Sequence, residues 1–166
     1  MSTDASARAG ALDEAQLAIL AAIVERLIPT DDRGPGAREA QAARYITTAL
    51  GAEYAGYLAE YRTGLASIDA HARTRYGRPF ASLEPLQQDD ILVSIERGQA
   101  AGDSPAPRTF FDLVLKHTRE GVFGDPRWGG NAEHVGWNMI GYAGPRYSWP
   151  AEAQRVETIV ETIRDV

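Results

Sequence analysis

The sequence predicts an all-α fold, an irregular helical bundle of about six or seven helices with a long ordered loop, rich in Gly and aromatic residues, near the C-terminal third. Apolar residues recur at three- and four-residue spacing in successive segments, and Gly and Pro interrupt the pattern between them. No alternating, strand-like segment exceeds a few residues. A chain of 166 residues fits one domain. We therefore expect a flexible N-terminal tail at 1–12 and a single helical domain at 13–166.

The first helix is expected to follow Asp13, which forms a capping-box pattern with Gln16. Pro29 ends this helix, and the turn-forming residues 29–36 predict a rigid connecting loop. A second helix is predicted at 37–50, where Gly51 supplies the C-terminal stop. The apolar face of the first helix comprises Leu17, Leu20, Val24, Leu27 and Ile28.

A longer helix is predicted at 53–76, and its apolar face carries three tyrosines whose hydroxyls are expected to reach water: Tyr54, Tyr57 and Tyr61. Pro85 opens the next helix, at the first helical position. Helices at 109–121 and, briefly, at 133–140 follow. The last helix should begin at Pro150 and dock its apolar residues on the core, namely Val156, Ile159, Val160 and Ile163.

Composition excludes several classes of function. Lys and Arg total 17 against 23 Asp and Glu, a net charge of −6, so the basic surface of a nucleic-acid-binding protein is missing. Cys is absent, which removes disulfides, thiolate metal sites and Cys nucleophiles. No apolar run approaches the roughly 20 residues of a membrane span, and residues 1–11 lack a secretory signal pattern. As written, the sequence predicts a cytoplasmic protein with no direct membrane span.

Polar, Gly and aromatic residues concentrate between His117 and Pro145, where any chemistry should lie. His117 and Glu120 are three residues apart on a predicted helix and could face one site, as a metal-ligand or acid–base pair requires. Asp125 could join them around a metal ion. The simpler interpretation is that His117 and Glu120 hydrogen-bond the Gly-rich loop and hold its backbone.

Other catalytic patterns are missing from this region. The glycines at 121, 124, 129 and 130 do not match a nucleotide-binding spacing, and no strand precedes them. No G-x-S-x-G elbow is present. The loop aromatics are more informative, because they either form a minor core or bind a partner. They are Trp128, Trp137, Tyr142, Tyr147 and Trp149.

Three segments carry a specific combined pattern: the helix end Leu27–Asp31, the break Arg75–Phe80, and the block Glu120–Asn131 with Gly136–Trp137 and Ile140–Tyr142. Together they resemble the gluconate 2-dehydrogenase subunit 3 family, the small subunits that accompany flavoprotein dehydrogenases of the glucose–methanol–choline type. The candidate partner-interface or structural residues are His117, Glu120, Gly121, Phe123, Asp125, Pro126, Trp128, Gly129, Gly130, Asn131, Gly136, Trp137, Gly141 and Tyr142.

The resemblance implies a large FAD-binding partner that oxidises a sugar, sugar acid or related alcohol, often with a cytochrome subunit that passes electrons on. The flavin and the catalytic base would belong to that partner, so no cofactor is expected in this chain. The small subunit would support folding, stability or export. Family members often begin with a twin-arginine signal, which residues 1–11 lack. The complex would be periplasmic if such a signal has been removed or belongs to the partner.

The residues leave three hypotheses open. In the first, the chain is an accessory subunit whose loops at 29–36 and 122–149 contact the flavoprotein, and Ala at Trp128 or Trp137 weakens the complex by about 2 kcal/mol. In the second, it is a stand-alone metal-dependent enzyme using His117, Glu120 and Asp125. In the third, it is a self-associating structural domain whose aromatic loops pair across a symmetry axis.

Overall fold

The computed structural model describes residues 12–98, 107–144, 148 and 151–155. This described part contains α-helices joined by 3-10 turns and no strand, which confirms the all-α prediction. The α-helices are α2 (Glu14–Leu27), α3 (Ala42–Leu50), α4 (Leu58–Tyr76), α5 (Pro85–Glu96), α6 (Pro107–Phe123) and α7 (Val135–Met139). The 3-10 turns are η1 (Ala55–Tyr57), η2 (Phe80–Ser82), η3 (Pro126–Trp128), η4 (Ala132–His134) and η5 (Ala151–Gln154).

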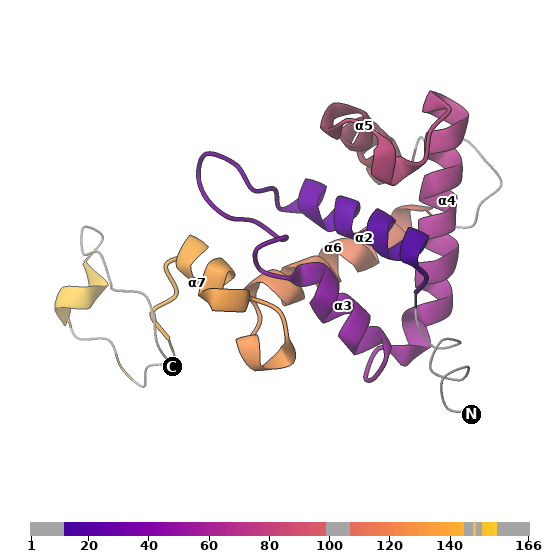
Figure 1. Cartoon of the computed structure of the whole chain (residues 1–166). Helices are drawn as coiled ribbons and strands as arrows, with labels where there is room; N and C mark the ends of the chain where they lie inside the picture. The colour runs from indigo at the N-terminus through magenta and orange to yellow at the C-terminus, as the bar shows by residue number, and fades with distance from the viewer. Residues whose placement is uncertain (1–11, 99–106, 145–147, 149–150, 156–166) are drawn as a thin grey trace.

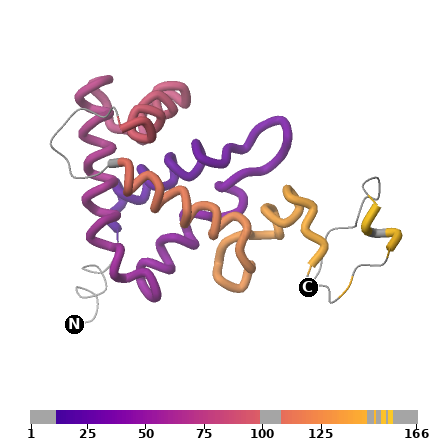
Figure 2. Tube along the Cα trace, turned by 180° about the vertical axis from the view of Figure 1, so that it is seen from behind, coloured from indigo at the N-terminus to yellow at the C-terminus, as the bar shows by residue number. Residues whose placement is uncertain are grey.

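Helix α6 is the centre of the bundle and packs against α2, α3, α4, α5 and α7. Figures 1 and 2 place α4 on one side of the bundle and α7 on the opposite side, with α6 running between them. The core therefore lies around α6, where apolar side chains of the other helices meet. Its largest fully buried side chains include Tyr61, Phe80, Leu20, Ile23, Ile46, Leu65, Ile68, Ile91 and Ile95.

Helix α2 begins with the predicted capping box. The Gln16 amide donates to Oδ1 of Asp13 at 2.8 Å, and the Asp13 amide donates to Oε1 of Gln16 at 3.0 Å. The predicted apolar face was wrong at its start, because Leu17 is 41% exposed. Leu20 and Val24 of that face are buried as predicted, and contacts with α3, α4, α5 and α6 also bury Ile19 and Ile23.

Helix α3 begins at Ala42, five residues later than the predicted helix at 37–50. Residues 37–41 form turns instead, because the Ala37 amide donates to the Ile28 carbonyl at 2.8 Å and returns the chain to the end of α2. Gln41 then adopts a left-handed conformation with φ of 56°, which cannot continue a right-handed helix. Tertiary contacts thus override the helical pattern at these residues.

The later helices follow the predicted order with small changes at their ends. The helix predicted at 53–76 starts as the 3-10 turn η1 and becomes α-helical at Leu58. Pro85 opens α5 at its first position, and Ile91, Leu92 and Ile95 are buried as expected. Helix α6 extends the predicted 109–121 helix by two residues at each end.

Two sequence predictions lie outside the described residues. They are the tail at 1–12, of which only Leu12 is described, and the apolar residues Val156, Ile159, Val160 and Ile163 of the last helix. Within the described ranges, no helix has the length and hydrophobicity needed to cross a membrane.

Candidate functional site

Asn131 organises the Gly-rich segment that follows α6. Its side chain and backbone are fully buried, and its φ of 44° is left-handed, a conformation that Asn tolerates better than most residues. The Asn131 amide donates to the Gly121 carbonyl at 2.6 Å, and Nδ2 donates to the Gly124 carbonyl at 2.8 Å. Its Oδ1 accepts from the Gly136 amide at 2.8 Å. The backbone and side chain of this one residue therefore tie the end of α6 to the first turn of α7.

Two glycines of this segment lie directly against the backbone of α6. A Cβ atom at Gly130 would lie 2.2 Å from the Gly121 carbonyl oxygen, and one at Gly136 would lie 1.9 Å from the Val122 carbonyl oxygen. No other residue fits at these positions without displacing the backbone. The glycines therefore serve close packing between backbones, which accounts for the pattern without a bound phosphate.

The loop aromatics divide into an inward and an outward group. The half-buried Trp137 donates from Nε1 to the Phe123 carbonyl at 2.9 Å, and its ring centroid lies 4.8 Å from that of Tyr142. Trp128 is 60% exposed and lies beside the guanidinium of Arg127, at 5.6 Å. Trp137 and Tyr142 thus pack inward, as the minor-core alternative expected, whereas the Trp128 ring is left exposed. Tyr147 and Trp149 lie outside the described residues.

The remaining predicted residues of this block shape its turns. Pro126 begins η3, and Gly129 ends it with a left-handed φ of 89°. Gly141 follows α7, and its amide donates to the Asn138 carbonyl at 3.2 Å. The next residue, Tyr142, returns to α7 by donating its amide to the Trp137 carbonyl at 2.8 Å.

His117 lies in the core and faces tyrosines instead of the Gly-rich loop. Its Nδ1 is 2.9 Å from the hydroxyl of Tyr61, and its ring stacks on Tyr54 with centroids 4.4 Å apart. Burial lowers the pKa of His117. The prediction that His117 holds the loop was therefore wrong, as was the prediction that the Tyr61 hydroxyl reaches water, because both side chains are 0% exposed.

Glu120 and Asp125 also have separate structural partners. Oε2 of Glu120 accepts from the Tyr54 hydroxyl at 2.9 Å. Oδ1 of Asp125 accepts from the Arg127 amide at 3.0 Å, and its other oxygen pairs with the Arg127 guanidinium at 2.8 Å. His117 and Glu120 thus share Tyr54 as a neighbour, whereas Asp125 binds Arg127. Among the described residues, no group of three or more His, Cys, Asp or Glu side chains is arranged to hold a metal ion.

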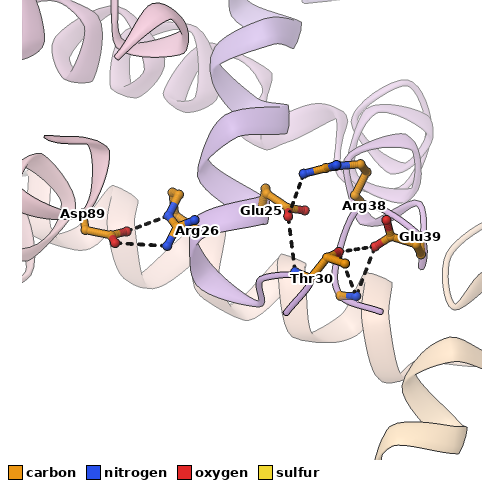
Figure 3. A network of polar contacts seen from close by, with 7 residues as sticks. Glu25, Arg26, Thr30, Arg38, Glu39 and Asp89 are labelled. Atoms are coloured by element: carbon orange, nitrogen blue, oxygen red, sulfur yellow. Dashed lines mark hydrogen bonds and ion pairs between the residues drawn. The ribbon is translucent and has the colours of Figure 1, made fainter. Parts of the chain in front are cut away.

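A network of polar contacts holds the loop between α2 and α3 (Figure 3). Oε1 of Glu25 accepts from the Thr30 amide at 3.2 Å and pairs with Arg38 at 2.7 Å. Oε2 of Glu39 accepts from the Thr30 hydroxyl and from the Gly36 amide, the latter at 3.1 Å. These bonds, the Thr30 hydroxyl first, lower the pKa of Glu39. The loop is therefore fixed at both ends by carboxylates.

The same network joins α2 to the rest of the bundle. Arg26, the neighbour of Glu25, donates to both oxygens of Asp89 on α5, at 2.7 and 3.0 Å (Figure 3). This two-bond pairing favours the charged guanidinium and raises the pKa of Arg26. The end of α2, from which the loop departs, is thereby held in place.

A groove of about 660 Å³ lies between this loop and α7. Both views show the loop and α7 at the same end of the molecule (Figures 1 and 2). The loop was predicted from the sequence as a contact segment, whereas the α7 side of the groove was not predicted. The spacing of Val135 and Met139, four residues apart and so on one face of a helix, was the available signal. The lining residues are Leu27, Ile28, Pro29, Asp31, Arg33, Gly34, Pro35, Val135, Asn138 and Met139.

Comparison with protein families now identifies the domain, because the model of gluconate 2-dehydrogenase subunit 3 matches residues 14–144. The chain belongs to the gluconate 2-dehydrogenase subunit 3 family. The match includes the α2–α3 loop, the Gly-rich segment and α7, so the whole groove lies within the family domain. Comparisons with curated proteins and with solved structures gave no match.

The segments that resemble the gluconate 2-dehydrogenase subunit 3 family have distinct places in the structure. Leu27 and Asp31 lie on one wall of the groove. Phe80 is fully buried, and its amide donates to Oδ1 of Asp69 at 2.8 Å, which closes the break after α4. The Gly-rich block joins α6 to α7 through Asn131. The family name describes its members as subunits of a dehydrogenase, and a subunit functions by contact with others.

Proposed function

We propose that this subunit 3 chain is a non-catalytic accessory subunit that binds a large FAD-dependent dehydrogenase subunit of the glucose–methanol–choline type. The observation that supports this best is the exposure of large apolar side chains in the segment at 122–144. Trp128, Met139 and Ile140 are 60%, 47% and 58% exposed. Large exposed apolar residues of this kind, Trp and Met above all, are enriched where proteins bind one another.

The polar residues of the segment support a structural role over a catalytic one. His117 is sealed among tyrosines, Glu120 binds Tyr54, and Asp125 caps η3. None of the three is left with its functional atoms directed into the groove, because that groove is lined by other residues. The flavin and the catalytic base would belong to the large subunit, whose pocket would select a sugar, sugar acid or related alcohol. The small chain would support the folding, stability or export of that subunit.

Purification of the tagged chain from its native host tests this proposal. The expected result is a yellow preparation with the absorbance of oxidised flavin and a large flavoprotein identified by mass spectrometry. Sugar and sugar-acid oxidation with an artificial electron acceptor then gives the substrate class. A colourless, homogeneous chain would contradict the proposal. Metal analysis of that preparation would then test whether the chain is a stand-alone metal-dependent enzyme, since a stoichiometric ion would support that hypothesis.

A further inference from the structure

We infer that the groove between the α2–α3 loop and α7 is the docking site for an uncharged, apolar segment of the large dehydrogenase subunit. This inference rests on the proposed function and adds where the partner binds and what chemistry it presents. The two walls come from segments about 100 residues apart in the chain, at Leu27–Pro35 and Val135–Met139. Six of the lining residues are apolar: Leu27, Ile28, Pro29, Pro35, Val135 and Met139.

The charges that line the groove compensate one another. Asp31 and Arg33 are the two charged lining residues, and the Arg33 guanidinium lies 3.3 Å from the Asp31 carboxylate. The same carboxylate accepts from the Arg33 amide at 2.8 Å, which holds it at the tip of the loop. A phosphate, a sugar acid or a charged peptide would find no free counter-charge in these walls, and burying an unpaired charge is costly. The complementary occupant is therefore uncharged and apolar.

The shape of the groove favours a protein segment over a small molecule. A volume of about 660 Å³ would suit either occupant. Small-molecule sites, however, enclose most of their ligand, whereas Pro29, Pro35 and Met139 on the two walls are all exposed. An open apolar groove instead accepts side chains that project from a segment whose backbone remains outside it. Met139 suits this role, because its unbranched side chain adapts to the shape of a partner.

The walls are fixed before any partner binds. Glu25 and Glu39 hold the loop through Thr30 and Gly36, and Asn131 holds the start of α7 through the Gly136 amide. A preformed site avoids much of the conformational entropy that a mobile one would lose on binding. Exposed Ile140, next to Met139, extends the apolar surface beyond the groove.

Competition within the assembled complex tests the groove. Tagged flavoprotein is co-expressed with equal amounts of the wild-type chain and one variant, and the ratio of the two chains in the purified complex is measured by mass spectrometry. Met139→Lys and Pro35→Lys each place a charge on a different wall, and each should be depleted at least tenfold. The matched control is Leu86→Lys, because Leu86 is 83% exposed on α5, away from α7 in both views (Figures 1 and 2). It should be recovered within twofold of the wild type, and circular dichroism confirms that each variant folds.

Photo-crosslinking identifies the occupant. Met139 is replaced by benzoylphenylalanine, and the crosslinked peptides of the irradiated complex are sequenced. A crosslink to an apolar, uncharged segment of the flavoprotein supports the inference. A crosslink to a second copy of this chain or within the chain itself overturns it, as does equal recovery of the two groove variants and the wild type. If the wild-type complex forms in that last case, the proposed function survives and only the groove assignment fails. If no complex forms with the wild type, both fail.

Discussion

The phenolic oxygen of Tyr61 lies 2.9 Å from Nδ1 of His117, and both side chains are fully buried between α4 and α6. Burial is the main reason that the pKa of His117 is lowered, while the negative charge of Glu120 opposes the shift. Burial thus favours the neutral form of the His117 imidazole. A histidine that binds a metal ion or transfers a proton needs contact with solvent or substrate, and the fully buried His117 has none.

The lowered pKa of His117 predicts how stability depends on pH. Below the ordinary His pKa of about 6.5, the unfolded chain binds a proton that the folded chain resists, so the free energy of unfolding falls as the pH falls. We expect urea unfolding at pH 5 and pH 7.5 to show a smaller difference in His117→Gln than in the wild type. Burial also lowers the pKa of His71, so the same measurement on His71→Gln is the matched comparison. An unchanged pH dependence in His117→Gln would contradict this assignment.

Asn131→Ala should destabilise the protein by about 3 kcal/mol, because it removes the side-chain partner of the half-buried Gly124 carbonyl and of the buried Gly136 amide, and places Ala in a left-handed conformation. The matched control is Asn138→Ala, since Asn138 is exposed and its side-chain nitrogen reaches the Glu133 carbonyl only at 3.5 Å. Urea unfolding monitored by Trp fluorescence measures both. Equal stability of the two variants would show that the hydrogen bonds of Asn131 do not hold the segment.

Gly136→Ala tests the close approach between α6 and the start of α7. The added methyl group would overlap the Val122 carbonyl oxygen, so the backbone must shift at a cost of about 3 kcal/mol. At Gly56 a Cβ atom meets nothing within 4 Å, and Gly56→Ala should be neutral or slightly stabilising. Thermal unfolding of the two variants under the same conditions separates these outcomes. A Gly136→Ala protein as stable as Gly56→Ala would show that the segment can move away from α6.

Local signals in the sequence predicted local structure well. The capping box at Asp13 and the start of α5 at Pro85 need only neighbouring residues, and both were predicted correctly. The family resemblance was also confirmed. The start of α3 was mispredicted, because the contact of Ala37 with Ile28 depends on the return of the chain to α2.

In the candidate site, too, features set by neighbouring residues were predicted and features set by tertiary contacts were not. The Gly-rich block was recognised as important, but the roles of its residues were not. His117 was paired with the wrong neighbours because its partner Tyr61 is 56 residues away, a separation that spacing on one helix does not reveal. The groove was missed for the same reason, since its two walls are far apart in the sequence and meet only in the folded chain.

Substitution of Trp128 should affect partner binding, whereas substitution of Trp137 should affect folding stability. Trp128→Ala removes an exposed ring and should leave the unfolding midpoint unchanged while weakening binding to the flavoprotein by about 2 kcal/mol, or roughly thirtyfold. Trp137→Ala removes a half-buried ring and its hydrogen bond to Phe123, and should cost about 2 kcal/mol of folding stability. Differential scanning calorimetry and the competition assay measure the two effects. A stable Trp128→Ala variant with full affinity would exclude Trp128 from the contact.

The Thr30 hydroxyl should control the shape of the groove without lining it. Thr30→Val removes the donor to Glu39 and an acceptor of the Gly36 amide. We expect faster hydrogen exchange at the Gly36 amide and a rise in the pKa of Glu39 toward its ordinary value, because the Thr30 hydroxyl is the main cause of the lowered pKa. The matched control is Thr63→Val, whose hydroxyl binds the Ala59 carbonyl on the exposed side of α4. Since the loop forms one wall of the groove, Thr30→Val should also bind the flavoprotein more weakly than Thr63→Val. Unchanged exchange at Gly36 would mean that other contacts hold the loop.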